Sequence, residues 1–163
     1  MNNGFSKKLT PDSAFTKVKH YCAYQERSHA EVKEKLYSYG LRKDDVEILL
    51  SRLIEENYLN EERYARQFAG GKFRMKKWGR VKITYELKQK RISTYNIKKG
   101  LEEIDEEQYQ SVLKKLVAHK WKSLKDEQHI IRQMKTQQYL LQKGFEPALI
   151  KLAIAELRKE ARD

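Results

Sequence analysis

The heptapeptide KLYSYGL at residues 35–41 recurs in related form as ELKQKRI at 86–92 and as YLLQKGF at 139–145. The corresponding leucines, Leu36, Leu87 and Leu140, are 51 and then 53 residues apart. Each segment is followed by apolar residues at spacing i, i+4, i+7, which is the pattern of one helix face. A period of this size is typical of one small helical unit copied in tandem, so we expect an extended array.

The rest of the chain also favours helices. Of its 163 residues only two are proline and seven are glycine, and the apolar residues follow the helical period rather than the alternation of strands. We therefore expect an all-α fold, an elongated tandem array of three-helix modules with about nine helices. A module of about 50 residues buries little apolar surface, so neighbouring modules should stabilise one another.

Residues that favour helix starts divide the chain, because their side chains can accept hydrogen bonds from free backbone N–H groups. The expected N-caps are Thr10, Ser28, Asn60, Ser93 and Asp105. From these signals we expect a flexible N-terminal tail at 1–9, a capping helix at 10–27, three-helix modules at 28–77 and 78–124, and a third module at 125–163 that is incomplete at its C-terminus.

The residue that follows the helix of each repeated segment differs in the middle copy. Gly40 and Gly144 stand where a helix usually turns into the left-handed backbone conformation, and Arg91 occupies the matching position in the middle copy. A residue with a Cβ costs about 1 kcal/mol in that conformation. Either the middle helix ends differently, or the arginine is present for another reason.

Positive charge is concentrated in the middle copy. The chain has a net charge of +12, and residues 72–91 contain nine cations and a single acid, Glu86. Phe73, Trp78 and Tyr85 are interleaved with these cations. Lysine and arginine neutralise phosphates while aromatic rings stack on bases, so the stretch is a candidate nucleic-acid or filament contact. The nine candidates are Lys72, Arg74, Lys76, Lys77, Arg80, Lys82, Lys88, Lys90 and Arg91.

A simpler interpretation of this stretch stays open. Trp78 and Tyr85 could pack between modules while the charges only solvate the surface, since a highly charged helical protein needs no polyanionic partner. A second group of lysines at 114–125 follows acidic residues at a helix start, and we interpret it as a solvated face.

No pattern in the sequence indicates catalysis or a cofactor. Phosphate-binding loops, nucleophile motifs and Cys-x-x-Cys pairs are absent from the sequence, and the four histidines lack metal-ligand spacing. The single cysteine, Cys22, lies at helical spacing with Ala14 and Val18 and is expected to be an inert core residue. The sequence lacks a signal peptide or a membrane-length apolar run, so we expect a cytoplasmic protein without a membrane partner.

Three blocks carry a family resemblance: ERSHAEVKEKL at 26–36, YLNEERYARQF at 58–68 and KWGRVKITYEL at 77–87. In order and spacing they resemble the signature blocks of the bacterial RecX regulatory proteins, and the resemblance extends over roughly 14–157. Within the blocks the matching positions include Arg27, Ser28, Gly79 and Arg80. Arg91 departs from the family pattern, which usually has glycine there, and Val32 stands where leucine is common.

The resemblance implies a curved helical array that binds the filament of the RecA recombinase on DNA. It implies inhibition of ATP hydrolysis and strand exchange by a monomeric protein that is no enzyme and needs no cofactor. We also expect the basic surface to contact single- and double-stranded DNA. Two rivals remain: a sequence-nonspecific DNA-binding module that acts without a recombinase, and a DNA-processing enzyme, for which no site residues are visible.

Overall fold

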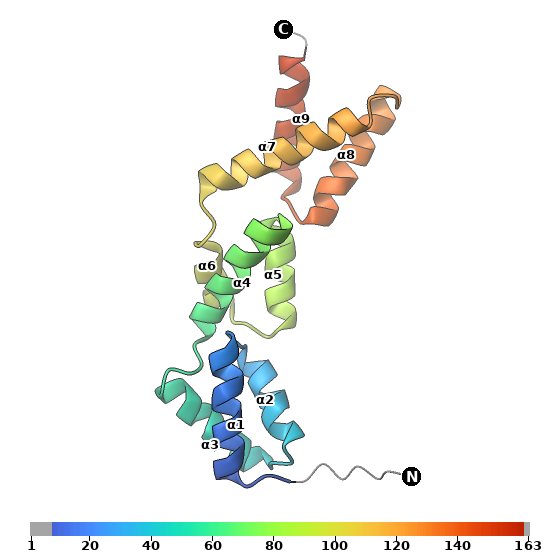
Figure 1. Ribbon diagram of the computed structural model, residues 1–163. Helices are drawn as coiled ribbons and strands as arrows, with labels where there is room; N and C mark the ends of the chain where they lie inside the picture. The colour runs from blue at the N-terminus through green and yellow to red at the C-terminus, as the bar shows by residue number, and fades with distance from the viewer. Residues whose placement is uncertain (1–7, 162–163) are drawn as a thin grey trace, which may run out of the picture.

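The computed structural model describes residues 8–161, and this part of the chain consists of helices joined by short connections (Figure 1). It contains no strand and forms an elongated array, so the predicted all-α fold of about nine helices is confirmed. The helices are α1 (Pro11–Tyr24), α2 (His29–Ser38), α3 (Lys43–Glu55), α4 (Glu61–Lys76), α5 (Arg80–Gln89), α6 (Thr94–Leu101), α7 (Glu106–Ser123), α8 (His129–Lys143) and α9 (Pro147–Glu160).

Helix packing groups these elements into three units, α1–α3, α4–α6 and α7–α9. α4 packs mainly against α6, and α7 packs against α8 and α9, so a long helix comes first in the second and third units. The boundaries expected at residues 28, 78 and 125 start the repeat one helix later. The repeat spacing gives the distance between copies, but it does not determine which helix begins each copy.

Side-chain caps start the helices where the sequence predicts them. The Ser28 hydroxyl accepts from the Glu31 N–H at 3.1 Å, and the Glu31 carboxylate accepts from the Ser28 N–H at 3.2 Å, a complete capping box. The other predicted caps also accept hydrogen bonds from the backbone three residues ahead: Thr10, Asn60, Ser93 and Asp105. Residues 1–7 of the expected flexible tail lie outside the described residues, while the Leu9 N–H donates to the Tyr39 carbonyl oxygen.

The three repeated segments end in the same left-handed turn. The backbone φ is +83° at Gly40, +61° at Arg91 and +93° at Gly144. The middle helix therefore keeps the geometry of its sister helices although it carries a Cβ there, at a cost of about 1 kcal/mol. Of the two explanations that the sequence leaves open, a different helix end is excluded.

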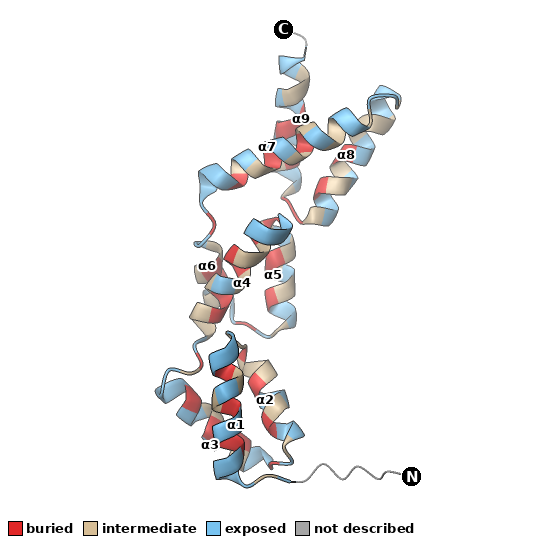
Figure 2. Cartoon of the chain, viewed as in Figure 1, coloured by how far each residue is buried: buried red, intermediate tan, exposed pale blue. Residues whose placement is uncertain are grey.

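The buried residues, which are red in Figure 2, form two separate hydrophobic cores. One belongs to α1–α3 and includes Cys22, whose thiol has a pKa raised to about 11 by burial. The other is continuous through α4–α9, where Tyr109 lies between Phe73 and Phe145, with ring centroids 5.7 and 5.1 Å away. The second and third units thus form one packed body.

Candidate functional site

Trp78 lies in the connection between α4 and α5, and three lysine side chains lie around its ring. The Nζ atoms of Lys82, Lys72 and Lys76 lie 4.5, 5.0 and 5.8 Å from its ring centroid. An ammonium group over an indole face gains about 0.5–1 kcal/mol at an exposed site. The ring is partly buried, and three ammonium groups surround it within 6 Å of its centroid.

Phe68 on α4 extends this arrangement towards the first unit. Its ring meets Trp78 edge-on with centroids 6.5 Å apart, and the Nζ atoms of Lys72 and Lys90 lie 5.4 and 5.7 Å from its centroid. Together these side chains form one patch, which we call the lysine–aromatic cluster: Phe68, Trp78, Lys72, Lys76, Lys82 and Lys90.

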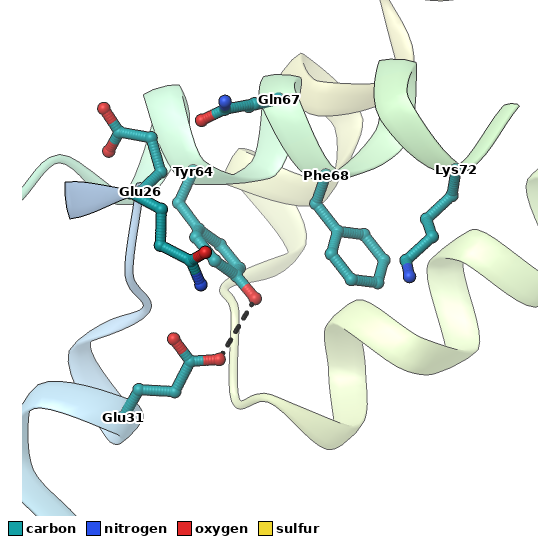
Figure 3. Close-up of a pocket in the computed structure, with 7 residues that line it drawn as sticks. Glu26, Glu31, Tyr64, Gln67, Phe68 and Lys72 are labelled. Atoms are coloured by element: carbon teal, nitrogen blue, oxygen red, sulfur yellow. Dashed lines mark hydrogen bonds between the residues drawn. The ribbon is translucent and has the colours of Figure 1, made fainter. Parts of the chain in front are cut away.

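One side of the cluster borders a hollow between the first and second units (Figure 3). Phe68 and Lys72 lie next to each other along α4, and Tyr64 points from the same helix towards Glu31. The opposite wall carries the carboxylates of Glu26 and Glu31. Burial, and then the nearby Glu31 carboxylate, raise the pKa of Tyr64, so its phenol stays neutral and donates to that carboxylate.

The other predicted cations differ in placement. Lys77, Lys88 and Arg91 are exposed on α5 or at the helix ends beside it. Arg74 lines a different hollow, together with Arg66 and Glu103. The structure therefore brings four of the nine predicted residues around the two rings and leaves Arg74 away from them.

Arg80 requires a correction, because the sequence suggested a free surface cation. Its Nη1 atom lies 2.7 Å from the Glu106 Oε2 atom and its Nη2 atom 2.9 Å from the Glu146 Oε2 atom, while its guanidinium stacks 3.9 Å from the Tyr109 ring centroid. The hydrogen bond from Arg80 lowers the pKa of Glu106 below its usual 4.5. Arg80 thus joins the second and third units, and its charge is already neutralised.

Three residues of the third unit extend the surface of the lysine–aromatic cluster: Lys120, Tyr139 and Lys143. The sequence indicated a solvated face for Lys120 and did not single out the other two as site residues. The Lys143 ammonium group donates to the Lys76 carbonyl oxygen at 3.2 Å and lies 6.0 Å from the Tyr139 ring centroid. The Lys120 Nζ atom lies 4.9 Å from that same centroid. The spacing of Tyr139 and Lys143 on one helix face was visible in the sequence. The contact of Lys143 with Lys76 joins residues 67 positions apart and leaves no local signal.

Two other kinds of site were sought in residues 8–161. No group of three or more histidine, cysteine or acidic side chains in this range could hold a metal ion. None of its helices combines the length and the apolar character that crossing a membrane requires.

The models of two domains of one protein family match the chain over its second and third helical units. The model for the second three-helix domain of RecX matches residues 60–101, and the model for the third matches residues 106–154. The regulatory protein RecX of Prosthecochloris aestuarii is 30% identical over 139 residues, which cover 84% of this chain and 88% of the relative. The chain belongs to the RecX family.

The RecX domain boundaries agree with the helix packing, since the two matched ranges correspond to α4–α6 and α7–α9. The regulatory protein RecX of Oceanobacillus iheyensis is 26% identical over 93% of this chain and 56% of the relative, and that of Lactococcus lactis subsp. cremoris SK11 is 30% identical over 87% and 54%. The chain thus spans about half the length of these two relatives.

A solved RecX structure has the same fold. The crystal structure of RecX from Lactobacillus salivarius superposes with a TM-score of 0.83 at 23% identity, covering 91% of this chain and 96% of that one. The elongated array of three-helix units is therefore a fold that this chain shares with a RecX protein.

Proposed function

We propose that this protein is a regulator that binds the RecA filament on DNA and inhibits RecA ATPase and recombination, and so acts in the control of DNA repair and the SOS response. Membership of a family of regulatory proteins supports a regulatory role. In this proposal it acts without catalysis or a cofactor, as a cytoplasmic monomer.

The lysine–aromatic cluster is the observation that carries the proposal. Four ammonium groups gather around two rings, and Lys143 continues the positive surface onto the third unit. Such a surface attracts phosphates or the carboxylates of an acidic protein surface, and it speeds the encounter with an anionic partner. An elongated body with cations along it suits a partner that is itself long and anionic.

The decisive experiment titrates the protein into a RecA ATPase assay on single-stranded DNA and measures its binding to bare DNA at the same salt concentration. Inhibition at protein concentrations that leave bare DNA unbound is the expected result. Inhibition that only follows the coating of bare DNA would instead favour the sequence-nonspecific DNA-binding module. That module would also show a salt slope of about −0.9 per phosphate neutralised.

Charge reversal then locates the interface. The triple variant Lys72→Glu, Lys76→Glu, Lys82→Glu should weaken inhibition, because it removes the cations around Trp78 and leaves the Arg80 ion pairs intact. The matched control reverses three exposed lysines outside the cluster: Lys33, Lys43 and Lys151. Equal potency of the two triple variants, at unchanged helicity, would place the interface elsewhere.

A further inference from the structure

The junction between α1–α3 and the rest of the chain differs in kind from the junction between the second and third units. Within residues 8–161, no apolar side chain of α1–α3 belongs to the core that runs through α4–α9. The second and third units, in contrast, share that core and are joined by two backbone hydrogen bonds, from Gly79 N–H to the Lys143 oxygen and from Val81 N–H to the Gly144 oxygen.

Charged side chains make the junction to α1–α3. The Arg63 Nε atom lies 2.5 Å from the Glu26 Oε1 atom. The Lys90 Nζ atom lies 3.5 Å from the Glu31 Oε1 atom, and the Tyr64 hydroxyl donates to the same oxygen at 3.5 Å. All four charged side chains are partly exposed to solvent, while the Glu26 Oε2 atom is itself buried. Salt in the surrounding water therefore reaches the two ion pairs in part.

These interactions hold the first unit weakly. An ion pair at the protein surface contributes about 0–1 kcal/mol, and salt screens such a pair to the extent that solvent reaches it. Apolar packing of the kind that joins the second and third units contributes about 25 cal/mol per Å² buried and is not screened in this way. The position of α1–α3 relative to α4 therefore depends on the charges at the junction, while α4–α9 keep their arrangement.

Lys90 belongs to both the junction and the lysine–aromatic cluster, since its ammonium group is shared between Glu31 and the Phe68 ring. We propose that the junction is an ion-pair hinge, and that an anionic partner that draws Lys90 away from Glu31 frees α1–α3 to reorient. This inference rests on the proposed function, because the anion-binding surface is the one that the regulator uses.

Pulsed electron–electron spin resonance on the full chain measures the hinge directly. In a Cys22→Ala background, spin labels at Ile48→Cys and Tyr95→Cys report on α1–α3 against the second unit. Labels at Tyr95→Cys and Leu152→Cys report on the second unit against the third. The three labelled positions are 64%, 65% and 61% exposed in the structure, so labels there leave the cores intact.

Salt and one substitution supply the two arms of the test. Raising NaCl from about 0.1 M to about 1 M shortens the Debye length from about 10 Å to about 3 Å. This change should broaden the 48–95 distance distribution and leave the 95–152 distribution unchanged. Lys90→Gln imitates a lysine engaged elsewhere and should broaden the 48–95 distribution at low salt. Lys88→Gln, the same charge change at an exposed position two residues earlier on α5, should not.

Each arm can overturn its part of the inference. A 48–95 distribution as narrow as the 95–152 distribution at both salt concentrations would exclude the hinge. A salt effect without an effect of Lys90→Gln would exclude the coupling through Lys90. Failure of the wild-type protein to inhibit RecA ATPase would overturn the proposed function but would leave the distance result standing, so the two failures are distinguishable.

Discussion

Gly79 and Gly144 lie backbone to backbone where the second unit meets the third. A Cβ added to Gly79 would overlap the Gly144 carbonyl group and lie 2.5 Å from the Phe145 nitrogen. Gly79→Ala should therefore separate the two units and lower the free energy of unfolding by about 1–3 kcal/mol, as overpacking does in a close-packed interior. Urea denaturation followed by circular dichroism measures this change.

Gly71 provides the control for this substitution. It lies inside α4, and a Cβ added there meets nothing within 4 Å. Gly71→Ala should raise stability by about 0.5–1 kcal/mol, because alanine loses less backbone entropy than glycine in a helix. Equal effects of the two substitutions would show that the contact of Gly79 with Gly144 is not what limits stability.

Arg80→Gln should destabilise the junction by about 1–3 kcal/mol, since it breaks charged hydrogen bonds to two carboxylates. It should also change the acid response. The pKa of Glu106 is lower in the folded state than its usual 4.5, so its contribution to stability is present above pH 4.5 and is lost as the pH falls through the folded pKa. Denaturation curves at pH 7 and below pH 4.5 should differ less for the variant.

The Cys22 thiol should be unreactive in the folded protein. Its pKa is raised from 9.0 to about 11 by burial, and the thiolate is the reactive form. A disulfide reagent at pH 8 should modify it only on unfolding. Because the folded pKa is the higher one, stability is complete below pH 9.0 and falls as the pH rises from there towards 11. Cys22→Ala should lack this loss, and rapid modification of the native chain would contradict the burial.

Trp78 should respond to the charge of a quencher. Three ammonium groups lie 4.5, 5.0 and 5.8 Å from its ring centroid. In a Trp121→Phe background, where Trp78 is the remaining tryptophan, iodide should quench its fluorescence more strongly than caesium does, because the cations attract the anion. The preference should disappear in the variant with glutamate at 72, 76 and 82. Equal quenching by both ions in the wild-type background would mean that the lysines do not stay at the ring.

Arg91→Gly should stabilise the protein by about 1 kcal/mol, because it relieves a left-handed conformation at φ +61°. The same variant tests whether the arginine has another purpose. Weaker RecA inhibition together with higher stability would show that Arg91 is kept for binding at the expense of the turn. Unchanged inhibition would remove Arg91 from the candidate surface.

The sequence predicts local features well in this chain. The capping box of Ser28 and Glu31 and the turn at Gly144 depend on residues within a few positions of each other, so a reader of the sequence can find them. The partners of Arg80 are 26 and 66 residues away along the chain. The sequence therefore shows that cations are concentrated in this stretch. Only the fold shows that Arg80 forms ion pairs with Glu106 and Glu146 while Lys82 lies at the Trp78 ring.

The backbone hydrogen bonds from Gly79 and Val81 have a consequence for how a repeating anionic partner is matched. They join main-chain atoms of the two units, so as long as glycine stands at 79 and 144 they fix the spacing between the backbone that carries the cations of the second unit and the backbone of Lys143. The second and third units therefore present their cations at a fixed spacing. A filament whose repeat differs from that spacing would not align its anionic groups with these cations. Within residues 8–161, the unit of α1–α3 has no such backbone bonds to the second and third units, so it could follow a filament that stretches or shortens.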